Sequence, residues 1–174
     1  PGSYDDNGEV EQLVIYLNDR NYNLTLELHY YVYEKCDIIT RSAKLVNSGN
    51  ESVRLERLMS MQLDLNESDY ELSFFNGAWA REMNRSRIPI RAGKYVNESV
   101  TGTSSNRANP FFMIGRSSTT EDYGECYGFN LIYSGNHYEA AQVNSYGKLR
   151  LVSGINPATF SYIIEAGKCF EAPE

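Results

Sequence analysis

The sequence predicts an all-β protein, arranged as an antiparallel twisted β-sandwich. Apolar residues alternate with polar ones in most segments, as in Leu24 to Val32, and this period of two is that of a half-buried strand. Clusters of Asn, Ser and Gly separate these segments at short intervals, as at Asn47-Ser48-Gly49-Asn50. No segment has a convincing helical period, so we expect roughly ten short strands.

The first part of the chain is predicted to form successive strands joined by polar turns. They cover Leu13 to Leu17, Leu24 to Tyr33, Ile38 to Val46, Val53 to Leu65 and Tyr70 to Phe74. The fourth of these segments is ambiguous, because it contains good helix formers. Its apolar residues nevertheless keep a period of two that only Arg57 breaks, so we interpret it as one strand.

The middle of the chain changes character. Gly77 to Lys94 concentrates arginines, and its Pro89 and Gly93 argue against a long helix, so we expect an extended excursion from the sheet. A polar loop is expected from Asn97 to Asn109, before a strand that Pro110 opens.

The apolar run from Cys126 to Tyr133 alternates cleanly and predicts a strand. The turn Ser134-Gly135-Asn136 follows, so we expect Tyr138 to Val143 to return as the partner strand of a hairpin. Later strands are expected at Leu149 to Leu151 and Phe160 to Ile164, followed by a turn at Glu165-Ala166-Gly167 and the final segment Lys168 to Phe170.

Size and charge limit the possible functions. The 174 residues correspond to one domain or a large fragment of one, residues 1–174. The net charge of -7 disfavours binding to nucleic acid or to an anionic membrane surface, since both need cationic side chains. No apolar run approaches the ~20 residues of a transmembrane helix. The chain begins at Pro1 and ends at Glu174, which we interpret as a segment of a longer protein, so the lack of a signal peptide decides little.

The three cysteines indicate a reducing compartment. Their number is odd and they form no C-x-x-C pattern, so we expect Cys36, Cys126 and Cys169 to be free thiols. Five N-x-S/T sequons, at Asn23, Asn50, Asn66, Asn84 and Asn97, would invite glycans in a secreted eukaryotic protein. We interpret them as chance products of an Asn- and Ser-rich composition.

Several long strings resemble the amino-terminal β-domain of the family 36 glycoside hydrolases, the bacterial α-galactosidases. They read TLELHYYVYEKCDIITRSAKLVNSGNESVRLERLMSMQLDL, FFNGAWAREMNRSRIPIRAGK, SSNRANPFFMIGR and EDYGECYGFNLIYSGNHYEA. The resemblance implies a β-supersandwich, present here as a partial domain whose missing strands precede Pro1. It also implies that the catalytic (β/α)₈ barrel is absent from this chain and that the protein is cytoplasmic and bacterial.

No catalytic site is predicted within the chain. His29 and His137 are the histidines, neither belongs to a metal-binding pattern, and we expect both to be surface or hydrogen-bonded residues, with no metal and no cofactor. No G-x-S-x-G elbow or glycine-rich phosphate loop occurs. The acids Glu121, Asp122 and Glu125 form a local group that is expected to be solvated. The resemblance implies a retaining mechanism with two aspartates on the barrel, and no catalytic residue transfers to this sequence.

Two groups of residues are candidates for contacts with substrate or with another surface. Trp79 with Arg81, and Asn106 and Arg107 with Asn109, combine aromatic and forked polar chemistry of the kind that binds sugars. The alternatives are a core tryptophan and a capped turn. We further expect Trp79 to Lys94 to dock on the barrel or on a neighbouring subunit, the alternative being a basic surface loop.

The resulting functional hypothesis is a non-catalytic β-sandwich portion of an α-galactosidase. Its partners would be the catalytic barrel of the same polypeptide, further copies in a homo-oligomer, and an α-galactoside such as melibiose or raffinose. A free-standing carbohydrate-binding module is the alternative, which galactose binding by the isolated chain would favour. A complete enzyme is a third hypothesis, which hydrolysis by the isolated chain would favour.

Overall fold

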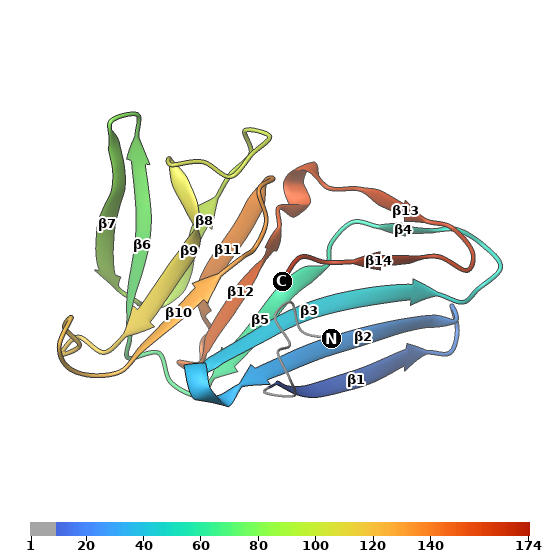
Figure 1. The fold of residues 1–174 in the computed structure, drawn as a ribbon, viewed down its shortest axis with the longest axis horizontal. Helices are drawn as coiled ribbons and strands as arrows, with labels where there is room; N and C mark the ends of the chain where they lie inside the picture. The colour runs from blue at the N-terminus through green and yellow to red at the C-terminus, as the bar shows by residue number, and fades with distance from the viewer. Residues whose placement is uncertain (1–9) are drawn as a thin grey trace.

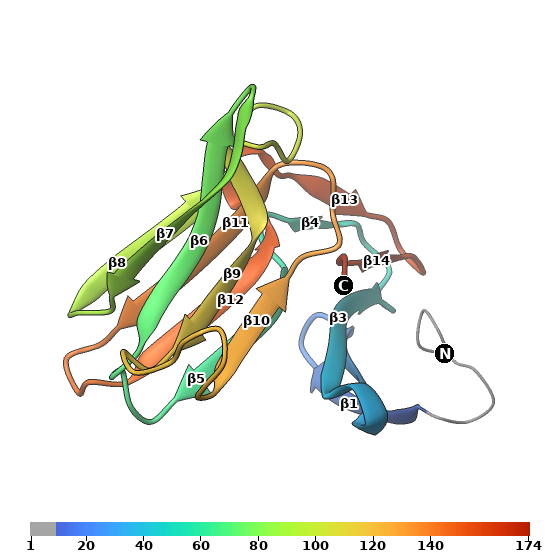
Figure 2. The same cartoon turned by 60° about the vertical axis from the view of Figure 1, so that its left-hand side comes forward.

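A computed structural model describes residues 10–174 as an all-β structure with antiparallel pairing throughout (Figures 1 and 2). The first sheet, in the order β1-β2-β3-β14, contains β1 (Glu11–Asp19), β2 (Leu24–Tyr33), β3 (Ile38–Asn47) and β14 (Cys169–Glu171). The second, β10-β9-β6-β7, contains β10 (Cys126–Asn130), β9 (Ala108–Gly115), β6 (Glu71–Ala78) and β7 (Arg81–Pro89). The third, β5-β12-β11-β8, contains β5 (Met59–Leu65), β12 (Leu149–Ile155), β11 (His137–Val143) and β8 (Gly93–Glu98). Strands β13 (Tyr162–Ile164) and β4 (Val53–Leu55) form a two-stranded ribbon.

The second and third sheets pack face to face and form the sandwich (Figure 2). Leu149 and Leu151 of β12 are buried against Phe112 and Ile114 of β9 in one apolar cluster. Alternate residues of each strand enter this cluster, as the period of two predicts. Each fully buried leucine stabilises the fold by about 1.5–3 kcal/mol. The sandwich therefore has a core of its own, and the prediction of an antiparallel β-sandwich is confirmed.

The first sheet stands beside the sandwich rather than within it (Figure 2). Its strand β3 meets β5 of the third sheet, where the Arg41 guanidinium donates a hydrogen bond to the backbone carbonyl of Gln62 at 2.6 Å. Leu13 and Leu17 of β1 are 55% and 51% exposed on this sheet. The two short helices, Glu34–Cys36 and Pro157–Thr159, lack the length and apolarity to cross a membrane, and no other helix occurs among residues 10–174.

The predicted hairpin between Cys126–Tyr133 and Tyr138–Val143 is wrong. Strand β10 ends at Asn130 and pairs with β9, whereas β11 pairs with β12 and β8 in the opposite sheet. The Leu131 amide still donates to the Pro110 carbonyl of β9, but the Ile132 amide donates to the Glu174 carbonyl, so the chain leaves the second sheet after Leu131. The turn at Ser134 therefore connects two sheets and does not close a hairpin.

The segment Val53–Leu65 is extended, as predicted, but it is two strands. Strand β4 pairs with β13 and β5 pairs with β12, so the chain changes sheets at residues 56–58. Arg57, which breaks the alternation, lies at this crossing and is exposed.

The expected excursion from Gly77 to Lys94 is also wrong, because this segment is part of the sandwich. Strand β7 pairs with β6 along its length, from Glu71 opposite Pro89 to Ala78 opposite Arg81. It is an edge strand in which only Ser86 and Ile88 are half-buried, so its sequence lacks the apolar alternation of a strand with a covered face. Strand β8 likewise occupies Asn97, which was assigned to a loop.

Candidate functional site

The tip of the β6–β7 hairpin (Figure 1) carries Trp79, followed by Arg81 at the start of β7. Trp79 is 90% exposed, which excludes the alternative of a core tryptophan. Met83 on the same tip is 59% exposed. Two large apolar side chains next to an exposed arginine thus face solvent at the end of one hairpin. In the part of the chain that the structure describes, no other residue covers this apolar surface.

The backbone of this hairpin tip is fixed by its own side chains. Ala80 and Met83 have φ angles of 59° and 56°, the left-handed region that residues other than glycine enter at a cost. The Ala80 amide donates to the Glu82 carboxylate at 2.8 Å, and the Asn84 amide group donates to the Arg81 carbonyl at 2.7 Å. These bonds offset the cost and fix the backbone of the turn that follows Trp79.

Asn106 and Arg107 form a tight turn that leads into β9, and Asn109 is the second residue of that strand. The Ala108 amide donates to the Ser105 carbonyl at 3.1 Å, and the Arg107 amide donates to the Ser105 hydroxyl at 3.2 Å. The Asn109 side-chain amide donates to the Phe75 carbonyl of β6 at 3.0 Å, so it holds two strands together. The turn is therefore capped by Ser105, Asn109 links β9 to β6, and Arg107 is exposed.

The structure brings both predicted groups to the same end of the second sheet. Asn76 of β6 is paired with Ala108 of β9, and Ala78 is paired with Arg81 of β7. The turn before β9 and the hairpin tip therefore lie at neighbouring strand ends, although β7 and β8 lie between them in the sequence.

The arginines between Gly77 and Lys94 differ in the contacts that they make. Arg87 makes an ion pair with Glu71 and donates to the carbonyls of Arg116, Ser117 and Thr119 at 2.8, 3.2 and 2.9 Å. It is thus a structural clamp on the loop after β9. Arg85 makes only a long ion pair, 3.9 Å from the Glu121 carboxylate. Arg81 and Arg91 are exposed.

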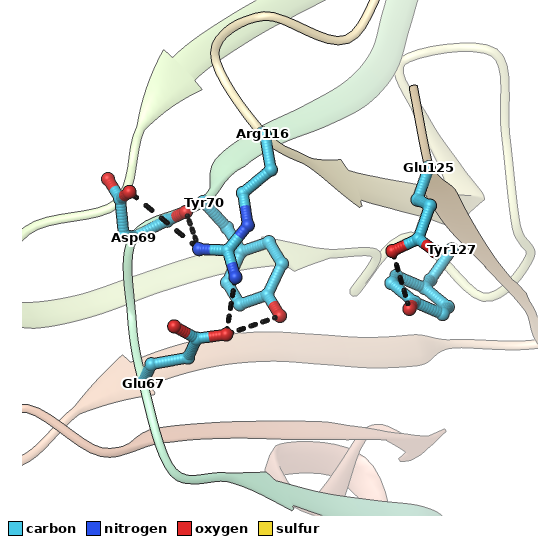
Figure 3. Close-up of polar contacts among 6 residues, drawn as sticks. All are labelled: Glu67, Asp69, Tyr70, Arg116, Glu125 and Tyr127. Atoms are coloured by element: carbon cyan, nitrogen blue, oxygen red, sulfur yellow. Dashed lines mark hydrogen bonds and ion pairs between the residues drawn. The ribbon is translucent and has the colours of Figure 1, made fainter. Parts of the chain in front are cut away.

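A second anchor of the same loop lies at Arg116 (Figure 3). Its guanidinium donates to the Asp69 carbonyl at 2.7 Å, pairs with the Glu67 carboxylate, and lies 4.3 Å from the centre of the Tyr70 ring. On the other arm of the loop, the Tyr127 hydroxyl donates to the Glu125 carboxylate at 3.4 Å. The loop 116–125 is therefore fastened to the sheet at its start and along its length.

Glu139 is a buried acid that the sequence analysis did not single out. It is 2% exposed, on the same face of β11 as Ala141 and Val143, and it borders a cavity of about 90 Å³ between the two sheets of the sandwich. Burial raises the pKa of its carboxyl to about 8, although Asn97 donates a hydrogen bond to it at 2.8 Å. It is therefore neutral at pH 7.

The histidines have different environments. His29 contacts the Glu27 carboxylate at 3.0 Å, as a hydrogen-bonded residue should. His137 contradicts its prediction, because it is fully buried at the start of β11 and neither of its ring nitrogens has a hydrogen-bond partner among the described residues. Burial lowers the pKa of its imidazole. No cluster of metal-binding side chains occurs within residues 10–174, where Cys36, Cys126 and Cys169 are exposed free thiols.

Known proteins similar to this chain agree on one family. The model of the glycosyl hydrolase family 36 N-terminal domain matches residues 1–165. The chain is 39% identical over 166 residues to alpha-galactosidase AgaA of Geobacillus stearothermophilus, and this match covers 95% of the chain and 23% of the relative. It is 34% identical over 174 residues to alpha-galactosidase 2 of Hypocrea jecorina, covering 100% of the chain and 23% of that protein.

Solved structures have the same fold. The alpha-galactosidase of Lactobacillus brevis superposes with a TM-score of 0.94 at 39% identity, covering 97% of this chain and 23% of its own. The crystal structure of a Geobacillus stearothermophilus AgaA variant with 1-deoxygalactonojirimycin gives a TM-score of 0.95 at 38% identity. This match covers 98% of the present chain and 24% of the chain in that structure. The chain thus spans about a quarter of the length of these relatives. It belongs to glycosyl hydrolase family 36, as the N-terminal domain of that family.

Proposed function

We propose that this chain is the non-catalytic N-terminal part of an α-galactosidase, a retaining hydrolase that releases terminal α-linked galactose from oligosaccharides such as melibiose and raffinose. The observation that carries the proposal is the match of nearly the whole chain to the N-terminal quarter of α-galactosidases. Residues 1–174 would form one β-sandwich domain or a large fragment of one. The same domain occurs within much longer relatives, which favours this role over a free-standing carbohydrate-binding module.

The carboxylates of the described chain support a non-catalytic role. Retaining glycosidases need two carboxyl groups about 5–5.5 Å apart across the scissile bond. Glu121 has a side chain that is 88% exposed on a loop, and Glu139 is enclosed between two sheets. Glu139 is thus closed off from a substrate, and Glu121 lies on a surface loop beside Asp122, so we assign the chemistry to the barrel of the same polypeptide.

The surface that supports docking is the hairpin tip, defined as Trp79, Arg81 and Met83. Tryptophan and arginine are the residues most enriched in binding hot spots, and this tip presents both on a backbone that is already ordered. It would pack on the catalytic barrel, at the mouth of the active site, or on a neighbouring subunit of a homo-oligomer. Preorganisation matters here, because ordering a loop on binding would otherwise cost free energy.

The test replaces Trp79 and Arg81 by Ala in the full-length enzyme. The double variant should weaken assembly or galactoside turnover by ~1–4 kcal/mol, as for buried anchors. Matched controls are Tyr146→Ala, which removes an aromatic ring that is 87% exposed elsewhere, and Arg57→Ala, which removes an exposed arginine. Arg116 is unsuitable as a control, because it anchors Glu67 and Tyr70. Unchanged oligomeric mass, melting temperature and catalytic efficiency would show that the tip is only a surface loop.

We assign the protein to the bacterial cytoplasm. Three exposed and unpaired thiols support this location, since an oxidising compartment would convert such thiols to disulfides or mixed disulfides.

A further inference from the structure

A hollow of about 530 Å³ lies under the loop 116–125, on the face of the second sheet that points away from the core. Its floor contains Glu71 and Ser73 of β6 beside Arg85 and Arg87 of β7. Leu72 and Ile88, the neighbours of these residues in sequence, pack into the core, so the alternation of the strands places the polar set outside. The volume is within the ~300–1,000 Å³ range of ligand sites in proteins.

The hollow is preformed, because its roof is bonded to its floor. Arg87 reaches up from β7 to three backbone carbonyls of the loop, at 2.8 to 3.2 Å. Within the loop, the Thr119 hydroxyl donates to the Glu125 carbonyl at 3.0 Å and the Thr120 amide to the Tyr123 carbonyl at 2.8 Å. The Arg116 anchor (Figure 3) fixes the first residue of the loop. No rearrangement of the loop is needed before a ligand can enter.

The charges in the hollow exclude several kinds of ligand. The Arg87 guanidinium is already bonded to Glu71 and to the loop, so Arg85 is the guanidinium left for a ligand. The carboxylates of Glu121 and Asp122 line the same hollow. An anion would be repelled by these carboxylates. A metal ion would lack ligands, since residues 10–174 contain no group of three suitable side chains. An apolar molecule would leave the charged groups desolvated without partners.

A neutral molecule with several hydroxyls fits the remaining chemistry. The Arg85 guanidinium and the Glu121 carboxylate are 3.9 Å apart, longer than a hydrogen bond, so each can still bond to a ligand. Each ligand hydroxyl can donate to a carboxylate and accept from a guanidinium or from the hydroxyl of Ser73, a residue that lines the floor of the hollow. Adjacent hydroxyls on a ring would bridge such an acid–base pair. We propose that the hollow under the loop 116–125 is a binding site for a neutral saccharide.

The experiment uses the full-length enzyme with its active site occupied by 1-deoxygalactonojirimycin, added only to the amount that fills one site per chain. Raffinose is then titrated in a calorimeter. We expect one raffinose to bind per chain under these conditions. Arg85→Met and Glu121→Gln should each weaken this binding at least 10-fold and leave hydrolysis of an α-galactoside unchanged. The Arg85 and Glu121 side chains are 47% and 88% exposed and are joined only by a 3.9 Å ion pair, so the melting temperatures should change little.

The controls are Arg57→Met and Glu56→Gln, which make the same chemical changes at exposed positions between β4 and β5. Loss of raffinose binding when the inhibitor is present overturns the proposal, and so does equal affinity in Arg85→Met, Glu121→Gln and the controls. Binding of inorganic phosphate in place of raffinose also overturns it. If the protein is not an α-galactosidase, the initial addition of 1-deoxygalactonojirimycin releases no binding heat. That result distinguishes an error in the proposed function from an error in the proposed saccharide site.

Discussion

Replacing Glu139 by Gln should stabilise the fold in a way that depends on pH. Glu139 is 2% exposed, and burial raises the pKa of its carboxyl from 4.5 to about 8. A carboxyl whose pKa is higher in the folded state gives a stability contribution that is complete below its unfolded pKa and is lost as pH rises through its folded pKa. Glutamine keeps the shape and the acceptor for Asn97 but cannot ionise.

The magnitude follows from linkage. Between pH 4.5 and pH 8 the wild type loses about 1.36 kcal/mol of unfolding free energy for each pH unit, because only the unfolded state releases the proton. The loss from this group is therefore about 3 kcal/mol at pH 7, but below about 1 kcal/mol at pH 5. The Gln variant does not have this loss, so its advantage over wild type should grow by about 2–3 kcal/mol between the two pH values.

Urea unfolding of the 174-residue chain, followed by circular dichroism at pH 5 and pH 7, measures this difference. His137 also responds to pH, since burial lowers its pKa, but it is present in both proteins and cancels in the comparison. The matched control is Glu56→Gln at an exposed position. An advantage that stays constant between the two pH values, within about 1 kcal/mol, would show that the Glu139 carboxyl is not buried in its neutral form.

Two further outcomes are expected from the isolated chain. Purified chain should not release nitrophenol from a nitrophenyl α-galactoside above a buffer blank, because the chain spans about a quarter of its relatives and we assign the chemistry to the barrel; turnover that survives repurification would contradict this. Ellman's reagent should titrate three thiols per native chain without denaturant, because Cys36, Cys126 and Cys169 are exposed and free; a count of one would indicate a disulfide.

The sequence predicts the strands whose faces differ most in environment. At the start of β12, Leu149 and Leu151 are buried while Arg150 between them is exposed, so the alternation of residues identifies this strand. In β2 the sequence alternates between apolar and polar residues, although nearly all of its residues are half-buried. The edge strand β7 has no comparable pattern, because nearly all of its residues are exposed. The partner of β10 could not be predicted either, since pairing with β9 instead of β11 depends on where the chain crosses between sheets after Asn130.

The candidate site was predictable in part. The sequence marks Trp79 and the arginines, but their roles depend on contacts between distant segments, such as Arg87 with the carbonyls of the loop 116–125. Glu139 was missed although a signal existed. In the segment HYEAAQV it shares the period-two face of Ala141 and Val143, which is the face expected to be buried.

Polar side chains link the strands that lead to the hairpin tip. Asn97 donates both to Glu139 in the core and to the carbonyl of Asn109, at 2.8 and 2.7 Å. Asn109 in turn donates to the carbonyl of Phe75 in β6, four residues before Trp79. A buried polar group left without a partner costs about 1–3 kcal/mol, so this chain of bonds specifies one arrangement of β8, β9, β11 and β6. Asn109 thus contributes to the proposed docking surface by positioning the strand that carries Trp79, and a direct contact with sugar is not required for its role.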